Sequence, residues 1–247
     1  MNIISRINVI LEEYKEDLPI LQENAMRYDN RGVATSSLIG AHRFIGIAEY
    51  LLNMDIETFR RELAYSARCR LDLLNRFDKG EDIARSLVAM TGGYNSLLDA
   101  LAGADHELSL ELASKIGGRE LIEVENDHPF DLAFGYILKS TVLRSSDICQ
   151  RNSVFGSQVE IVKNVDFVGY ARAFDMLNDD DEADASKVIS EILDGHKKQS
   201  KKGGVFNGTE DEALCVWGIA MANLMISRGK CIDVDDSILP RVLLQGG

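Results

Sequence analysis

The four histidines are the side chains in this sequence that most readily bind a metal or carry a proton. They are His42, His106, His128 and His196, and none lies in an HExxH motif, in a His-Asp dipeptide or four residues from another histidine. Mononuclear zinc sites and metal-dependent phosphohydrolases need such spacings. One Glu-x-x-His pair, Glu125 with His128, does occur, but a ferritin-like di-iron site needs two such pairs on facing helices. The histidines therefore predict neither a metal nor a cofactor.

The glycine pairs and the cysteines give no catalytic motif either. Gly92–Gly93, Gly117–Gly118 and Gly203–Gly204 follow no predicted strand, and neither GxxxxGK[ST] nor GxSxG occurs, which disfavours a nucleotide-binding loop and a serine nucleophile. The cysteines are scattered without a CxxC pair, so we expect reduced thiols that are mostly buried. They are Cys69, Cys149, Cys215 and Cys231. The sequence thus predicts no catalytic residues and a protein that is not an enzyme.

The acidic side chains are the remaining candidates for a functional site. The chain of 247 residues carries 40 Asp and Glu against 27 Lys and Arg, a net charge of −13. Nucleic-acid binding needs a basic face that neutralises phosphates, so this charge disfavours a nucleic-acid partner and fits a basic protein. The same charge also serves solubility through self-repulsion, and the sequence leaves this second interpretation open.

Two acidic clusters supply the predicted partner-binding residues. Their carboxylates lie in polar turns and not in the apolar cleft of a glycosidase, so we expect them to steer a basic partner and not to catalyse. The candidate residues are Asp179, Asp180, Asp181, Glu182, Asp184, Asp233, Asp235 and Asp236.

The spacing of apolar residues predicts the secondary structure that positions these candidate residues. Apolar residues recur at three- and four-residue spacing through most of the chain, and only three prolines interrupt it. This is the pattern of amphipathic helices that pack on one another. We therefore predict an all-α fold, in which antiparallel helical hairpins pack into one compact helical domain over residues 1–247. Residues 152–165 alternate like a strand or loop, and we place a candidate subdomain boundary near 150–165.

Helix boundaries in the first part of the chain follow from capping residues. Asp17 is expected to end the first helix and to cap a second, in which Pro19 lies in the first turn. Helices over 38–53 and 56–74 are expected to form a hairpin, with Asp55 capping the second of them.

Glycines and polar runs set the expected boundaries further along. A helix over 83–101 is expected to bend at Gly92–Gly93 in its middle. A connector over 120–129 then separates a short helix at 106–116 from a helix over 130–148.

The last third of the chain contains the clearest helical patterns. Helices are expected over 167–177 and 185–193, and Thr209 with Glu212 is expected to form a capping box before the helix that holds Trp217. Trp217 has apolar neighbours at every helical spacing, so we expect it in the core, with an interface anchor as the alternative.

The same region carries a resemblance to a known family. The segment SRGKCIDVDDSILPRVLL at 227–244, preceded by VGYARAFDMLNDDDEADASKVISEILDGHKK at 168–198, resembles the C-terminal pattern of the immunity 49 family of bacterial polymorphic toxin systems. The match covers the C-terminal third, while upstream only the helical layout agrees. The resemblance implies a cytoplasmic antitoxin that binds a cognate toxin and blocks it stoichiometrically. It implies no catalytic residues and no cofactor.

Localisation and two alternative functions complete the expectations. The N-terminus lacks the unbroken apolar run of a signal peptide, and no stretch approaches the roughly 18 to 20 apolar residues that span a bilayer, so we expect a cytoplasmic protein without membrane contact. A helical-repeat scaffold or adaptor is one alternative, although no constant period of about 34 to 47 residues recurs. A helical enzyme with dispersed residues is the other. Its candidate residues are His42, Glu49, Arg68 and Asp72. The sequence also leaves room for a homo-oligomer.

Overall fold

A computed structural model describes residues 3–161, 165–178 and 184–245. These residues form eleven α-helices joined by short loops and 3₁₀ turns, without a β-strand, so the predicted all-α fold is confirmed for the described part. No helix there is both long and apolar enough to cross a bilayer. The helices are α1 (Ile3–Arg27), α2 (Val33–Asn53), α3 (Ile56–Asp78), α4 (Met90–Ala102), α5 (His106–Lys115), α6 (Glu120–Asn126), α7 (Pro129–Leu143), α8 (Ile148–Ile161), α9 (Val168–Asn178), α10 (Ala185–Gln199) and α11 (Val216–Ser227).

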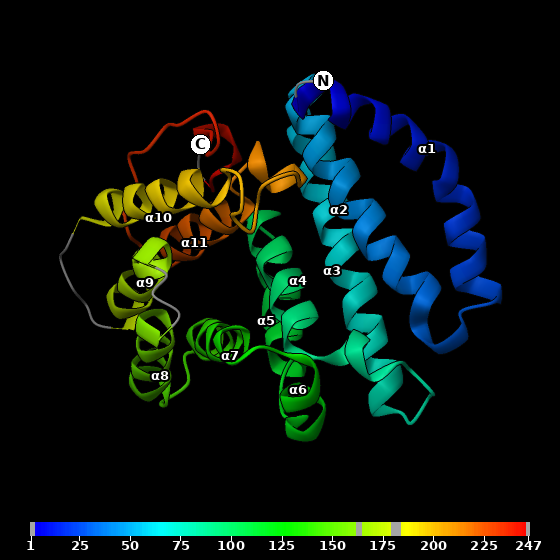
Figure 1. Ribbon diagram of the computed structural model, residues 1–247, viewed down its shortest axis with the longest axis horizontal. Coiled ribbons are helices and arrows are strands. Elements are labelled where there is room, and N and C mark those ends of the chain that lie inside the picture. The colour runs from blue at the N-terminus through cyan, green and yellow to red at the C-terminus, as the bar shows by residue number, and fades with distance from the viewer. Residues whose placement is uncertain (1–2, 162–164, 179–183, 246–247) are drawn as a thin grey trace.

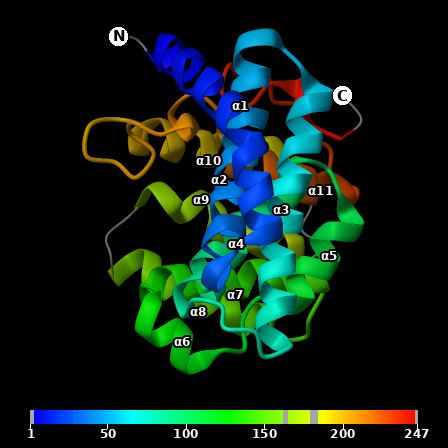
Figure 2. The ribbon, with the colours of Figure 1, turned by 90° about the vertical axis from the view of Figure 1, so that its right-hand side faces the viewer.

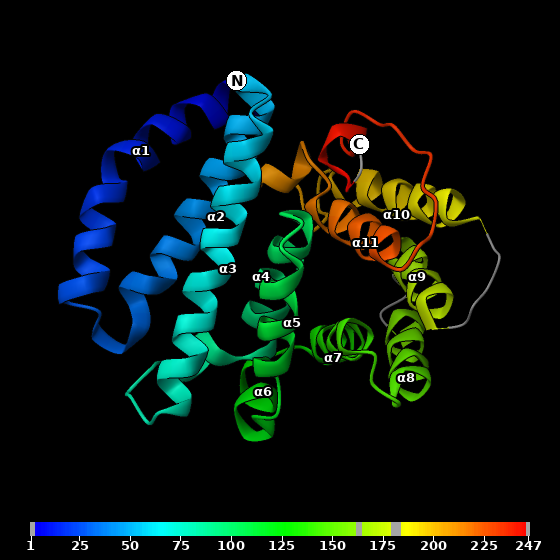
Figure 3. The same ribbon diagram turned by 180° about the vertical axis from the view of Figure 1, so that it is seen from behind.

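Helix α4 is central to the arrangement, since it packs against α3, α5, α7 and α11. Figures 1 and 3 show α4 and α5 between the α2–α3 hairpin on one side and the α10–α11 pair on the other. Helix α1 packs on α2 and covers the outer side of the hairpin (Figure 2). Side chains from α2, α4, α7 and α11 can therefore meet in the middle of the molecule.

The α2–α3 hairpin has the predicted boundaries. Met54 ends α2 with a left-handed φ of 57°, and Asp55 caps α3, because its Oδ1 accepts the N–H of Thr58 at 2.9 Å. Gly46 lets the two helices approach closely. A Cβ there would lie 3.1 Å from the carbonyl oxygen of Phe59, so a larger residue would push the hairpin apart.

The apolar core consists of a large cluster and a small one. The large cluster draws on α2 to α11 and on the C-terminal segment, from Ile39 to Leu244. The small cluster joins α1 to α2. Its buried members are Ile7, Leu11, Phe44, Ile45 and Ala48. Helix α1 is thus attached by a much smaller apolar surface than the helices of the large cluster.

Helix α1 continues through Pro19, so the predicted break at Asp17 is wrong. A proline inside a helix removes one backbone hydrogen bond and bends the helix, and α1 is visibly curved in Figure 1. Tyr14 and Leu18 pack on the small cluster on either side of the expected break. Apolar contact with α2 therefore outweighs the local cost of the proline.

Helix α4 begins at Met90, later than predicted, because a distant carboxylate fixes its first turn. The two carboxylate oxygens of Asp127 accept the N–H groups of Met90 and Thr91 at 2.8 and 2.9 Å. Residues 85–88 form a separate 3₁₀ turn. The Gly92–Gly93 pair consequently lies in the first turn of α4, where Gly93 makes room for Ile116, and not in the middle of a bent helix.

Two segments predicted to be irregular are helical. The connector over 120–129 contains α6, whose start is stabilised by Glu123, because its carboxylate accepts the N–H of Arg119 at 2.8 Å. The stretch from 152 to 161 belongs to α8, where Phe155 and Val159 join the large cluster. The strand-or-loop interpretation is wrong there, since apolar contacts of this helix outweigh its weak local periodicity. The subdomain boundary near 150–165 and the single domain stay predictions.

Two smaller predictions are also wrong. The capping box fails because Thr209 Oγ1 donates to the carbonyl of Phe206 and Glu212 accepts the N–H of Gly208, so α11 starts only at Val216. The cysteines are not mostly buried. Cys215 is buried and Cys69 half-buried, but Cys149 and Cys231 are exposed on the surface. All four are free thiols.

Candidate functional site

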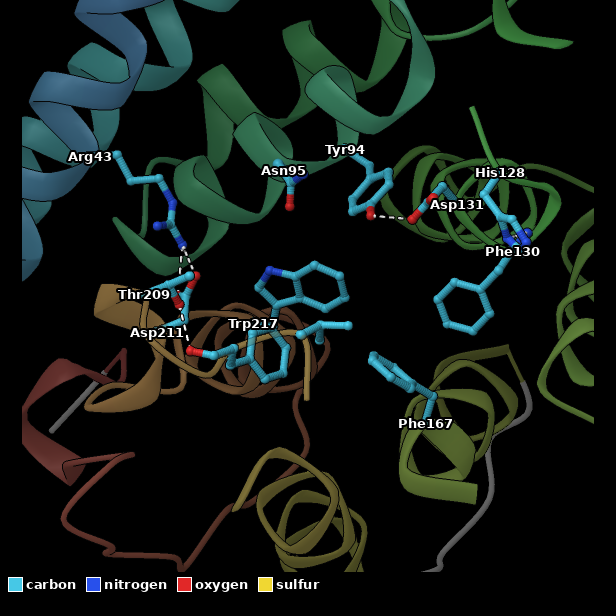
Figure 4. A pocket seen from close by; sticks show the side chains of 12 residues that line it. Arg43, Tyr94, Asn95, His128, Phe130, Asp131, Phe167, Thr209, Asp211 and Trp217 are labelled. Atoms are coloured by element: carbon cyan, nitrogen blue, oxygen red, sulfur yellow. Dashed lines mark hydrogen bonds and ion pairs between the residues drawn. The ribbon is translucent and has the colours of Figure 1, made fainter. Parts of the chain in front are cut away.

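A pocket of about 550 Å³ opens where α2, α4 and α7 meet the 3₁₀ turn before α9, the loop before α11 and the start of α11 (Figure 4). This volume lies within the usual range for small-ligand pockets, roughly 300 to 1,000 Å³. The lining residues are Arg43, Tyr94, Asn95, His128, Phe130, Asp131, Phe167, Val205, Phe206, Thr209, Asp211 and Trp217. Arg43 and Asp211 lie on one side of Trp217, and Phe130 and Phe167 on the other.

The aromatic wall of the pocket consists of the rings of Tyr94, Phe130, Phe167, Phe206 and Trp217. Trp217 lies edge to face with Tyr94, at 5.6 Å between ring centroids and 89° between planes, and with Phe206 at 5.7 Å and 77°. Behind it, Phe134 stacks on Trp217 at 5.0 Å. Such pairs add stability beyond the area that they bury.

The core position predicted for Trp217 is confirmed, and the alternative of an interface anchor stays a prediction. Trp217 belongs to the large core cluster with 9% of its surface exposed, and it also lines the pocket. A residue can do both when it lies at the floor of a cavity, with one side packed on Phe134 and the other open to the pocket.

The charged wall consists of Arg43 with Asp99, Glu210 and Asp211. Arg43 Nη2 donates to both carboxylate oxygens of Asp211 at 2.7 and 2.9 Å, and Nε donates to Asp99 at 3.1 Å, while Nη1 donates to Glu210. The side chain of Arg43 is 16% exposed and that of Asp99 2%. One guanidinium thus ties α2 to α4 and to the 3₁₀ turn before α11, and three carboxylates share it.

Burial and the neighbouring charges together set the pKa values of Arg43 and Asp99 in this wall. Burial alone would lower the pKa of Arg43, but the three carboxylates raise it above its usual value. Burial raises the pKa of Asp99 to about 6, although Arg43 and Ser66 oppose the shift. The raised pKa values of Arg43 and Asp99 are consistent with each other. One guanidinium shared by three carboxylates only partly offsets the burial of Asp99, which is the most buried of the three.

His196 holds the other side of the same turn. Its Nε2 donates to the backbone carbonyl of Asp211 at 2.7 Å, and its ring stacks on Phe206 at 4.3 Å. Burial lowers the pKa of His196 to about 4, against the effect of the carbonyl bond. His196 is therefore neutral near pH 7 and positions Asp211 and Phe206 as an uncharged hydrogen-bond donor.

At the opposite end of the pocket, Asp131 is held by Tyr94. The hydroxyl of Tyr94 donates to Asp131 Oδ1 at 2.8 Å, and burial together with the nearby Asp131 carboxylate raises the pKa of Tyr94 well above its usual value. His128 caps α7, since its Nδ1 accepts the N–H of Phe130 at 3.2 Å. Asp131 forms no ion pair with any residue that the structure describes.

The four predicted partner-binding acids that the structure describes, Asp184, Asp233, Asp235 and Asp236, do not line this pocket. Asp179, Asp180, Asp181 and Glu182 lie outside the described residues. Asp184 caps α10, because its carboxylate accepts the N–H of Ser186 at 2.9 Å. The hydroxyl of Ser186 in turn accepts the N–H of Asp233 at 2.9 Å, which brings Asp184 and Asp233 to the same end of α10.

The other acids of the C-terminal segment have local partners. Asp236 forms an ion pair with Lys197 of α10 at 2.6 Å, and Asp233 pairs with Arg241 at 3.2 Å. Asp235 accepts the N–H of Arg241 at 3.2 Å. This segment therefore follows α10 from its start toward its end, and its acids contribute to holding it there. Their role in partner binding stays a prediction.

The residues considered for a dispersed enzyme site each contact a different partner. His42 pairs with Glu62 at 2.7 Å in a buried position, and Arg68 pairs with Asp105 at the surface. The remaining two pairs are Glu49 with Lys15 and Asp72 with Arg76. In the described ranges, no three His, Cys, Asp or Glu side chains are placed to hold a metal ion.

The sequence patterns did not reveal this pocket. Its lining comes from five stretches of chain between Arg43 and Trp217, and helical periodicity assigns apolar residues to a core without saying which of them border a cavity. Its five aromatic residues come from separate elements, so no local pattern in the sequence pointed toward it. No protein-family model, curated protein or solved structure matches the chain.

Proposed function

We propose that this chain is an immunity protein that binds a basic protein toxin in the cytoplasm and neutralises it by stoichiometric inhibition. The observation that carries the proposal is the aromatic pocket, a concave site with two fixed walls on a strongly acidic chain. Partner proteins bury their anchoring side chains in such well-packed concave sites, where a few residues supply most of the affinity.

The net charge of the chain supports the proposal that its partner is basic. A chain with a net charge of −13 attracts a basic partner over a distance, which raises the association rate. A standard interface buries about 800 Å² on each partner, a small part of the accessible surface of 11636 Å². The helical scaffold therefore has ample surface for an interface around the pocket.

The resemblance of residues 227–244 and 168–198 to the immunity 49 family supplies the class of partner. The separate partners of His42, Glu49, Arg68 and Asp72 favour binding over a dispersed catalytic site, because catalytic groups must converge on one substrate.

Co-expression tests this proposal directly. The chain is expressed together with the toxic C-terminal domain encoded by the neighbouring open reading frame, and cell survival is compared with that of cells carrying an empty vector. We expect survival and a one-to-one complex on size-exclusion chromatography. Continued killing in cells that contain abundant soluble chain would contradict the proposal.

A further inference from the structure

The rings of the aromatic wall are steeply inclined to one another. Phe130 and Phe167 meet edge to face, with ring centroids 5.0 Å apart and planes at 71°, and Phe167 and Trp217 are inclined at 60°. The face of an aromatic ring is the negative end of its quadrupole. A cation within about 6 Å of such a face is attracted to it, and most strongly when the ring is Trp.

The charged side chains of the pocket also favour a bound cation. The pocket lining contains two carboxylates, on Asp131 and Asp211, and one guanidinium, on Arg43. The guanidinium is already shared by Asp99, Glu210 and Asp211. Asp131 lacks a cationic partner among the described residues and receives only the hydroxyl of Tyr94. A guest with a positive charge would therefore supply what this end of the pocket lacks.

We infer that the pocket binds an organic cation, an ammonium or guanidinium group on an apolar body, with its charge between the aromatic rings and the carboxylate of Asp131. This inference rests on the proposed function, in which the cation is a Lys or Arg side chain of the partner protein. The half-open rim at Val205, which is 62% exposed, offers apolar contact to the methylene groups of such a side chain.

The alternatives fit the walls less well. An anion would meet the carboxylates of Asp131 and Asp211 while Arg43 is occupied by its own carboxylates. A neutral apolar guest would fill the aromatic space and leave Asp131 in a less hydrated place without a counter-charge, which costs free energy. The cation is favoured because it both fills the space and pairs with the carboxylate.

The test uses the purified full chain and the fluorescence of Trp217, the only tryptophan. The probes are choline, methylguanidinium and N-acetyl-arginine methylamide, and the control ligand is 3,3-dimethylbutan-1-ol, a neutral molecule with the shape of choline. We expect the cations to bind at least about tenfold more tightly than the neutral alcohol. Equal binding of choline and the alcohol, or no binding of any cation, would overturn the inference.

The choice of probes also separates two sources of the cation. Tighter binding of N-acetyl-arginine methylamide than of choline identifies a protein side chain, as the proposed function requires. The reverse order identifies a free small-molecule cation; it supports the cation site and removes the link to the partner protein.

Asp131→Asn is the variant that removes the charge while its amide oxygen can still accept from Tyr94. We expect cation binding to weaken about tenfold, with the neutral alcohol unaffected. The matched control is Glu111→Gln, which changes the net charge equally at an exposed position on α5 and is expected to leave both affinities unchanged. Equal weakening by the two variants would contradict a specific role for Asp131. If Asp131→Asn does not fold, the comparison of choline with the neutral alcohol on the wild-type chain still decides the inference, because equal binding of the two overturns it.

The two proposals fail in different ways. Cells that survive the toxin although the purified chain binds no cation would refute the cation site and leave the immunity function standing. Selective cation binding without protection of cells would do the opposite.

Discussion

The aromatic wall and the charged wall border the same pocket but are held by different forces. The aromatic wall depends on buried area and ring packing, which change little with pH or salt. The charged wall depends on one guanidinium shared among three carboxylates, with Asp99 2% exposed, and so depends on the protonation of its members. The comparison indicates that pH should act mainly on the charged wall and should reach the aromatic wall through His196, whose ring stacks on Phe206.

Removing Trp217 should have the largest effect on stability. Trp217→Ala deletes the ring that contacts Phe134, Tyr94 and Phe206, and we expect a loss of about 3 to 5 kcal/mol in the free energy of unfolding. Urea denaturation followed by circular dichroism measures it. Trp217→Phe, which keeps an aromatic ring, should cost clearly less. A fully stable Trp217→Ala chain would show that the aromatic wall contributes little to folding.

Removing Arg43 should have the next largest effect. Arg43→Met leaves Asp99 and Asp211 without their counter-charge in a largely buried place, and we expect a loss of about 3 kcal/mol near pH 7. The loss should shrink at lower pH, where the carboxylates can be protonated. Arg43→Met combined with Asp99→Asn should recover part of the stability, and strictly additive effects of the two changes would show that the residues are not coupled.

Acid titration should reveal opposed contributions of Asp99 and His196 to the free energy of unfolding. The pKa of Asp99 is raised to about 6 from 3.8, so the stability it contributes is full below about pH 3.8 and is lost as the pH rises through 6. The pKa of His196 is lowered to about 4 from 6.5, so its contribution is full above about pH 6.5 and is lost as the pH falls through 4. Between pH 4 and 6.5 the two partly cancel.

Single variants separate these contributions. Asp99→Asn should make the chain lose about 2 kcal/mol more than wild type on acidification from pH 6.5 to 4, and His196→Gln should make it lose less. Urea midpoints at the two pH values measure both changes. Identical pH profiles for wild type and both variants would show that the turn carrying Asp211 is not held by titratable groups.

The acids at 179–182 should have the smallest effect on stability and should act mainly on the rate of association. Replacing Asp179, Asp180, Asp181 and Glu182 with Ser should slow association with a basic partner mainly at low salt, since the attraction between charges in water is screened beyond about 10 Å at 0.1 M salt. Stopped-flow measurements at two salt concentrations test this. An unchanged association rate would confine these acids to solubility.

How much the sequence could predict differs between the two walls. Helical spacing correctly assigned Trp217 to the core and set the α2–α3 hairpin, where Asp55 caps the helix that follows it in sequence. It could not predict the charged wall, because Arg43 and Asp211 are brought together by the packing of α2 and α11 around α4 and no local pattern links them.

The misplaced helix ends have the same cause. Local rules placed a break at Asp17 and a helix start at Ile83, whereas packing of α1 on α2 and the carboxylate of Asp127 decide the observed ends. At Asp55, where a residue within one turn supplies the cap, the sequence was sufficient. Where the cap or the contact comes from a remote segment, it was not.

The two hydrogen bonds that Asp127 accepts from the start of α4 also affect the order in which parts of the chain can fold. During synthesis from the N-terminus, the N–H groups of Met90 and Thr91 lack this acceptor until residue 127 has left the ribosome, after α5 and α6. The first turn of α4 should therefore become fixed only after the chain has folded back on itself. Because Tyr94 and Asn95 follow directly in α4, this edge of the pocket should become fixed later than the α2–α3 hairpin, whose two helices both precede it in the chain.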